Sequence, residues 1–136
     1  MDTGLVSISD GVVPQAESFA LLEFSRDTSL ASGTQAVTGV GLKPSAVILF
    51  GVVNAAVGRA SWGMDTITDA VASADQHATT ADTYLADGSN SIYCDQGSGN
   101  AYSGNVQSFD SDGFTIDWTK TSSPTGTLTI LALCYK

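Results

Sequence analysis

Two aspartates that flank a serine and precede a glycine, Asp110, Asp112 and Gly113, are the most ligand-like carboxylate motif of this 136-residue chain. A calcium loop of the EF-hand kind needs oxygen ligands at positions 1, 3, 5 and 12 and a glycine at position 6. With Gly113 at position 6, position 12 is Thr119, and alternating apolar residues stand where the second helix should begin. Turn chemistry accounts for the motif, because Asp bonds its own backbone and Gly takes the left-handed conformation. We therefore expect a tight turn and no metal site.

His77 is the only histidine and the only obvious general base near neutral pH. A Ser–His–Asp hydrolase also needs an activated serine. The closest candidate is Ser61, but Arg59 stands where a nucleophile elbow has its first glycine. The only two glutamates, Glu17 and Glu23, do not stand beside an aspartate in a pattern typical of a glycosidase pair. The sequence therefore predicts a protein that is not an enzyme and has no cofactor.

Two cysteines, Cys94 and Cys134, lie far apart and form no CxxC motif. A zinc site needs about four ligands, and one histidine cannot complete the set. Cys134 lies in an apolar C-terminal run and is expected to be a buried free thiol. Cys94 lies in a polar region, and a disulfide between the two cysteines stays open at this stage.

Four aromatic residues stand out in the polar middle of the chain: Trp62, Tyr84, Tyr93 and Tyr102. Exposed rings beside Asn and Asp are a common way to build a sugar-binding surface, because rings stack on the apolar faces of sugars. Rings of this kind also close the ends of small β domains or contact a partner subunit. The sequence favours core or interface and leaves glycan contact as the alternative.

Composition limits the classes of partner. Charged residues make up 14% of the chain, against about 25% in a typical protein. The net charge is −9, and the five cations are scattered, so neither nucleic acid nor an anionic membrane surface is an expected partner. The N-terminus has no basic segment and no long apolar core, so we expect no signal peptide. A surface this poor in charge indicates cover by copies of the chain or by another protein, or else an acidic surface of the secreted kind.

The alternation along Val106–Thr119 predicts a β-hairpin, with Phe114, Ile116 and Trp118 on one face. Ala46–Phe50 is the most hydrophobic segment and predicts a central strand buried on both faces. Further strands are expected at Leu5–Ile8, Phe19–Phe24, Gln35–Val40, Ser61–Met64, Ser91–Cys94 and Thr127–Tyr135, the last of them central.

From Gly51 to Asn105 the chain is rich in small and polar residues and predicts a long loop-rich segment with a few irregular strands. A short helix is expected over Thr68–Ala78. The role of Ala55–Asn105 stays open. Short strands with turn signals about every ten residues predict an all-β fold, an antiparallel β-sandwich or jelly roll, as a single domain over residues 1–136.

The strands suggest that the chain self-associates. Monomeric sandwiches usually protect their edge strands with Lys, Pro or inward charges. The predicted strands Leu5–Ile8, Phe19–Phe24 and Thr127–Tyr135 contain no Lys or Arg. Pairing with a neighbouring subunit would satisfy such edges, so we expect a homo-oligomer.

Two segments resemble small structural proteins of tailed bacteriophages. They are Val37–Gly51, with the sequence VTGVGLKPSAVILFG, and Ser108–Thr119, with the sequence SFDSDGFTIDWT. Tyr135, near the end of an apolar strand, is similar to the closing run of those proteins. Leu42 departs from the pattern, which has Phe there. The same strands more loosely resemble H-type lectin domains, which are trimeric sandwiches.

The resemblance implies a non-enzymatic structural protein located in the virion. The implied role is a capsid decoration (cement) protein that binds the outer surface of the major capsid protein. A tail or fibre module is the other virion position that it leaves open. The lectin-like resemblance implies a trimer, and it leaves a carbohydrate-binding module of a tail fibre or receptor-binding protein as the alternative function.

Overall fold

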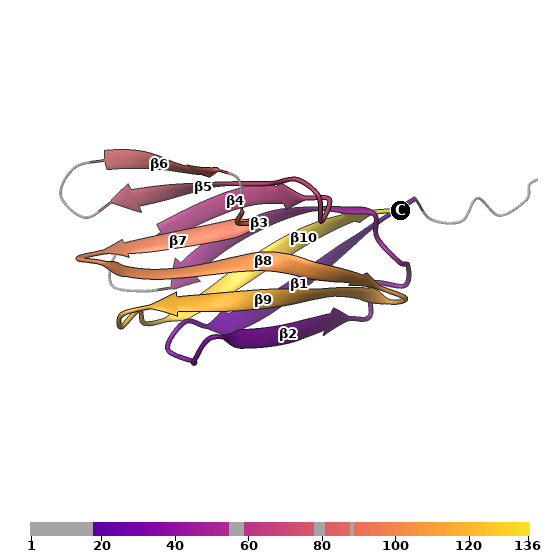
Figure 1. Cartoon of the computed structure of the whole chain (residues 1–136), viewed down its shortest axis with the longest axis horizontal. Helices are drawn as coiled ribbons and strands as arrows, with labels where there is room; N and C mark the ends of the chain where they lie inside the picture. Colours follow the sequence, from indigo (N-terminus) through magenta and orange to yellow (C-terminus); the bar gives the residue numbers. More distant parts are fainter. Residues whose placement is uncertain (1–17, 55–58, 78–80, 88) are drawn as a thin grey trace, which may run out of the picture.

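The computed structural model describes residues 18–54, 59–77, 81–87 and 89–136, and for residues 75–77 and 81–87 it describes the backbone alone. Within these residues the regular structure is β-strand, arranged as two antiparallel sheets that pack against each other (Figure 1). The predicted all-β antiparallel sandwich is therefore confirmed. The strand expected at Leu5–Ile8 lies outside the described residues.

The larger sheet has six strands in the order β1-β10-β3-β4-β5-β6. The first and last strands of the described chain are neighbours, and β10 lies between β1 and β3 in continuous antiparallel register. The strands are β1 (Phe19–Asp27), β3 (Ala46–Asn54), β4 (Arg59–Asp65), β5 (Ala70–His77), β6 (Ala81–Asp87) and β10 (Thr127–Tyr135).

The smaller sheet has four strands in the order β2-β9-β8-β7. The predicted hairpin is its centre, because β8 and β9 pair across the turn that Asp110 and Gly113 bound. A bulge between Val106 and Ser108 adjusts the register. The strands are β2 (Gly33–Thr38), β7 (Ile92–Gly97), β8 (Asn100–Asp110) and β9 (Gly113–Thr121).

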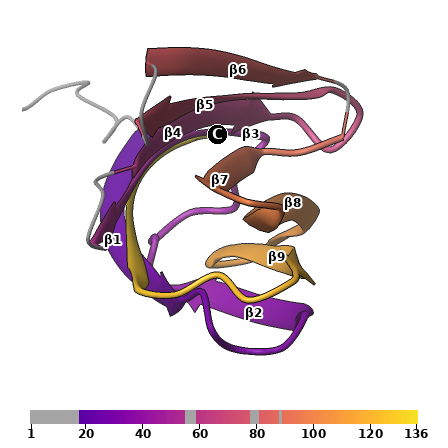
Figure 2. The same ribbon diagram turned by 90° about the vertical axis from the view of Figure 1, so that its left-hand side faces the viewer.

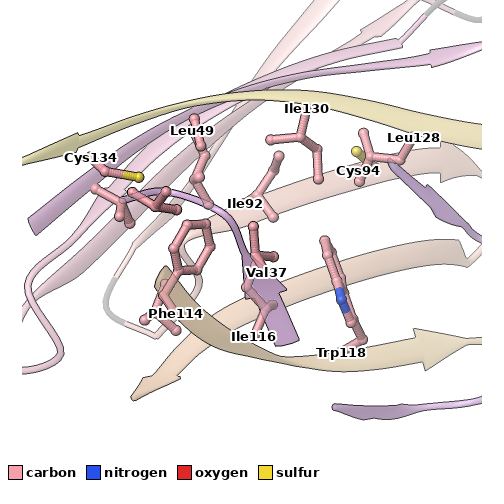
Figure 3. Close-up of a cluster of buried hydrophobic side chains, with 14 of the residues drawn as sticks. Val37, Leu49, Ile92, Cys94, Phe114, Ile116, Trp118, Leu128, Ile130 and Cys134 are labelled. Carbon is pink, nitrogen blue, oxygen red and sulfur yellow. The ribbon is translucent and has the colours of Figure 1, made fainter. Parts of the chain in front are cut away.

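The core lies between the two sheets (Figure 3). Phe114, Ile116 and Trp118 of β9 are fully or almost fully buried and point into it, as the alternation predicts. From the larger sheet they meet residues such as Leu49 of β3 and Ile130 of β10. Burial of this many large apolar side chains is the main source of stability in a domain of this size.

The larger sheet curls around the smaller one (Figure 2). At one edge of the smaller sheet, the Gln35 amide of β2 donates to the Ser25 carbonyl of β1 over 3.0 Å. At the opposite edge, the Ser61 hydroxyl of β4 accepts a hydrogen bond from the Tyr93 backbone N–H of β7 over 3.0 Å. Because one sheet holds both edges of the other, its inner face is concave and its outer face is convex.

Three expectations about the chain's local structure are wrong. Within the expected helix over Thr68–Ala78, the residues Ala70–His77 form strand β5, whose small residues Ala72 and Ala74 are buried. The described part of Gly51–Asn105 is not loop-rich, since β4 to β7 and the first half of β8 lie within it. Strand β3 is central but is buried on one face only, because Phe50 and Val52 are exposed.

The two segments that carry the phage resemblance meet in space. Strand β2 pairs with β9, and the Asp112 carboxylate accepts hydrogen bonds from the backbone N–H groups of Gly39 (3.1 Å) and Gly41 (2.6 Å). Gly113 has φ of +145°, and a Cβ there would lie 1.9 Å from the Val37 carbonyl oxygen. Only glycine fits that close approach.

Candidate interaction surface

The carboxylates that resemble metal ligands mostly form hydrogen bonds that stabilise the fold. Asp110 accepts hydrogen bonds from the Ser108 and Thr115 hydroxyls at 2.9 and 2.8 Å. The Asp112 carboxylate accepts the hydrogen bonds from Gly39 and Gly41 that are described above. Within the described residues, no group of three or more His, Cys, Asp and Glu side chains lies close enough to hold a metal ion. The Asp110–Gly113 motif is thus a structural turn.

Cys94 and Cys134 are both free and fully buried, so the open question of a disulfide is answered by two separate thiols. Burial raises the pKa of Cys94 to about 12 and that of Cys134 to about 11, against an ordinary value of 9.0. Thiolate is the reactive form of cysteine. Neither cysteine is therefore a nucleophile in the folded protein, and the expectation of a buried free thiol at Cys134 is confirmed.

The described residues that were candidates for a hydrolase site do not lie together. Glu23 and Ser61 both lie on the larger sheet, but Glu23 is exposed on β1 and Ser61 is buried on β4, where it bonds the backbone of β7. The side chain of His77 and the whole of Glu17 lie outside the described residues. In the described part of the chain no helix is long and apolar enough to cross a membrane.

The four singled-out aromatic residues do not form one site. Tyr102 is fully buried, stacks on Trp118 at a centroid distance of 5.2 Å, and accepts a 2.8 Å hydrogen bond from the Arg26 Nε. Glycan contact by Tyr102 is therefore wrong. Tyr93 is half-buried and alternates with buried residues of β7, so it faces the outside of the smaller sheet. Tyr84 lies on β6, and its side chain is outside the described residues.

Among the three of these residues whose side chains the structure describes, Trp62 is the one that lies on a large exposed surface. It is 49% exposed on the convex side of β4. Cross-strand register places Phe50 of β3 beside it and Leu131 of β10 beside Phe50. Their exposures are 52% and 41%. Residues paired across antiparallel strands lie on the same face, so these three form a row across the sheet.

A second apolar row runs parallel to the first and is displaced from it by two residues along each strand. It runs from Leu21 of β1 to Val71 of β5, and Val71 pairs with Asp87 of the edge strand β6. We call the combined surface the apolar outer face. Its exposed members are Phe19, Leu21, Phe50, Val52, Trp62, Met64, Val71, Leu131 and Tyr135, and the partly buried Ile48 and Leu133 complete it.

The alternation in strand β4 explains why this face is apolar. Its residues alternate between polar and apolar, but the polar set points inward and the apolar set outward. The inward Arg59, Ser61 and Asp65 are bonded to the edge of the smaller sheet. Arg59 Nη2 donates to the Gln96 carbonyl over 2.8 Å, and the Asp65 carboxylate accepts from the Ser91 hydroxyl and, over 3.3 Å, from the Val106 N–H.

Close packing at the same place requires Gly63. A Cβ on Gly63 would lie 2.0 Å from the Ser91 carbonyl oxygen. The inner side of β4 therefore contacts the smaller sheet through polar side chains and through Gly63, which has no side chain. Its apolar residues are left on the outside.

Among the side chains that the structure describes, the central row of the apolar outer face carries little charge. Along the row that contains Phe50 and Trp62, the described members are Glu23, Leu131, Phe50, Trp62 and Ser73. Glu23 lies at the β1 end of that row, which is a rim position.

The aromatic residues of the polar middle segment indicated Trp62, but they did not indicate the rest of this face. The available signal was the continuous apolar run in β1, β3 and β10, which places apolar residues on both faces of an antiparallel strand. Comparison of the chain with protein-family models, with curated proteins and with solved structures found no match.

Proposed function

We propose that this protein is a non-enzymatic structural protein of a tailed-bacteriophage particle, where it binds the major capsid protein as a decoration protein. The observation that carries the proposal is the apolar outer face. Monomers rarely expose a contiguous apolar patch above about 300–600 Å², and larger patches usually mark sites of protein contact. The phage-like segments Val37–Gly51 and Ser108–Thr119 supply the reason to look for that contact in a virion.

The use of the polar groups also supports a structural role. The described carboxylates of Asp65, Asp110 and Asp112 bond backbone or hydroxyl groups of the same chain. Both thiols are buried and have raised pKa values. These groups contribute to a rigid sandwich, which is what an external reinforcing protein needs.

The direct test is to look for the chain in particles. Mass spectrometry of purified virions should detect it at a fixed copy number per capsid protein, and cryo-electron microscopy should show it on the outer capsid surface. Density at the tail would move the assignment to a tail or fibre module. Absence of the chain from purified particles would contradict the proposal.

Exposure of Trp62 favours one second candidate, a carbohydrate-binding module of a tail fibre or receptor-binding protein. A sugar site needs polar groups beside the ring to fix the ligand. The cross-strand neighbours of Trp62 are Phe50 and Ser73, so only one side of the ring offers such a group. This function predicts saturable binding on a glycan array that Trp62→Ala weakens, and a flat array would remove it.

A further inference from the structure

We infer that Ile67, in the turn between β4 and β5, is an apolar anchor that enters an apolar pocket with a positively charged rim on the protein that this chain binds. Ile67 is 48% exposed and lies outside the apolar outer face defined above. The turn consists of residues 66–69. The inference rests on the proposed function for the identity of the bound protein, which is the major capsid protein.

The backbone of Ile67 lies in the left-handed region, which is costly for this residue type. Its φ is +74°. A β-branched residue is a clear outlier there, whereas Gly, Asn and Asp adopt the region more easily. Among the described residues other than glycine, Ser98 and Ser122 also have a positive φ, and both have small side chains. The chain therefore gives up stability by having isoleucine at position 67.

The interior of the sandwich explains the conformation of the turn but not the side chain. Asp65 is fully buried, and its carboxylate accepts hydrogen bonds from the Ser91 hydroxyl and the Val106 N–H of the smaller sheet. The same carboxylate accepts a hydrogen bond from the Ile67 N–H, which holds the backbone of the turn. An asparagine or a glycine would suit this backbone better than isoleucine does. Strain of this kind at an exposed position is typical of a residue that is kept for binding.

The polar groups of the turn bond one another. The Thr66 N–H donates to the Asp69 carbonyl over 3.0 Å, and the Asp69 N–H donates to the Thr66 hydroxyl over 3.2 Å. The Thr68 hydroxyl lies 3.1 Å from the Thr66 hydroxyl and donates to the Asp69 carboxylate over 3.1 Å. The turn therefore presents one apolar side chain on a backbone that is already ordered, which lowers the entropy cost of binding.

The turn lies where a protein bound to the apolar outer face would reach it. Met64 and Val71, which belong to that face, pair directly beside Asp65 and Ala70, the pair that closes the turn. Ile67 thus extends the proposed contact beyond the end of β4. An exposed aliphatic side chain gains free energy only if its partner removes it from water, so the partner must offer an apolar pocket.

The charge beside Ile67 indicates the rim of that pocket. Asp69 is exposed on the same turn, and the chain as a whole carries −9. Complementary charges at the rim of an interface increase the rate of association and set its orientation. A lysine or arginine of the partner beside the pocket would meet the Asp69 carboxylate.

Ile67→Asn separates the cost of this residue from its use. Asparagine adopts the left-handed region more easily, so the variant should unfold at a higher urea concentration than the wild type. The variant also lacks the aliphatic side chain, so its affinity for capsids without this chain should fall about tenfold or more, as expected for one fully buried aliphatic group. Urea unfolding followed by tryptophan fluorescence measures stability, and cosedimentation with purified capsids measures affinity.

Leu30→Asn is the matched control. Leu30 is 49% exposed and lies in the turn after β1, at the other end of the larger sheet from Ile67. The φ of Leu30 is not positive, so the substitution relieves no strain. The control should change the affinity for capsids by less than about twofold and should not raise the urea midpoint.

Asp69→Asn tests the charge of the rim. Asparagine keeps an acceptor oxygen for the Thr68 hydroxyl and removes the negative charge. The affinity for capsids should fall several-fold at about 0.01 M sodium chloride and less at about 0.15 M, because salt screens exposed charges. An affinity that is unchanged or higher at every salt concentration would contradict a positively charged rim.

Three results with Ile67→Asn and its control would overturn the inference. They are an Ile67→Asn variant that binds capsids as tightly as the wild type, an Ile67→Asn variant that unfolds at the same or a lower urea concentration, and a Leu30→Asn variant that loses as much affinity. In each case the wild type still binds capsids, so the proposed function stands. A wild-type chain that does not bind capsids would contradict the proposed function and the inference together.

Discussion

Asp112 shows how a ligand-like carboxylate can be structural. Its two oxygens accept the backbone N–H groups of Gly39 and Gly41, which joins the loop after β2 to the turn before β9. The turn was predictable from the sequence, because its chemistry is local. The acceptor role of Asp112 was not, since the donors lie more than 70 residues away in the chain.

We predict that Asp112→Asn destabilises the fold by about 1–2 kcal/mol, because an amide keeps one acceptor oxygen and loses the charge that strengthens both hydrogen bonds. Urea unfolding followed by tryptophan fluorescence measures the change. The control is Asp117→Asn on β9, whose side chain is exposed, and it should change stability by less than about 0.5 kcal/mol. Equal losses in the two variants would contradict the assigned role of Asp112.

We predict that Cys94 and Cys134 resist Ellman's reagent at pH 8 in the folded protein and react fully in denaturant, because both are buried and have raised pKa values of about 12 and 11. The unfolded thiols ionise near their ordinary pKa of 9.0 and the folded ones do not. Stability is therefore unaffected by these thiols below about pH 9 and falls as the pH rises beyond it. Rapid labelling of either thiol without unfolding would be inconsistent with the core.

At the scale of the element, β4 is where the usual interpretation of alternation fails. Apolar residues at every second position normally mark the buried face of a strand. In β4 the buried residues are Arg59, Ser61, Gly63 and Asp65, and the apolar ones are outside. The inward set is useful only because β7 approaches it closely, and that approach is a tertiary fact that the sequence of β4 does not contain.

The helix predicted where β5 lies was wrong for a related reason. Alanine favours a helix in isolation, and tertiary context routinely overrides that preference. Here Val71–Ala74 pairs with β4 on one side and β6 on the other, and buried alanines allow β5 to lie against β7. The strands at Phe19–Phe24 and Thr127–Tyr135 were predictable because their apolar runs are long and are bounded by clear turns.

The junction of β2 and β9 gives a prediction at this scale. Gly113→Ala should cost about 3 kcal/mol or more, because it combines a positive φ with a Cβ 1.9 Å from the Val37 carbonyl oxygen. Gly99→Ala is the matched control, since Gly99 has φ of +78° and nothing lies within 4 Å of its Cβ position. It should cost about 1–2 kcal/mol. Urea unfolding compares them, and equal costs would show that the contact with Val37 is not limiting.

At the scale of the whole molecule, the net charge and the apolar outer face have opposite effects on self-association: the charge opposes it and the apolar face favours it. Each chain carries −9, and chains that self-associate through the apolar outer face must approach closely. Added salt shortens the range of this repulsion from about 30 Å at 0.01 M to about 8 Å at 0.15 M.

We therefore predict that assembly strengthens as sodium chloride rises from about 0.01 to 0.15 M, as expected for an apolar interface between like-charged chains. Sedimentation velocity at each salt concentration gives the association constant. An assembly that dissociates over the same range would indicate that ion pairs hold it and would contradict an apolar interface.

The most direct test of self-association through the apolar outer face is acrylamide quenching of Trp62 as a function of protein concentration. The chain has two tryptophans, and Trp118 is buried, so subtracting the signal of Trp62→Phe isolates Trp62. At nanomolar concentration Trp62 should be quenched readily, as its 49% exposure requires. At micromolar concentration its quenching should fall toward that of Trp118. Quenching of Trp62 that stays equally strong at every concentration would show that no copy of the chain covers this face.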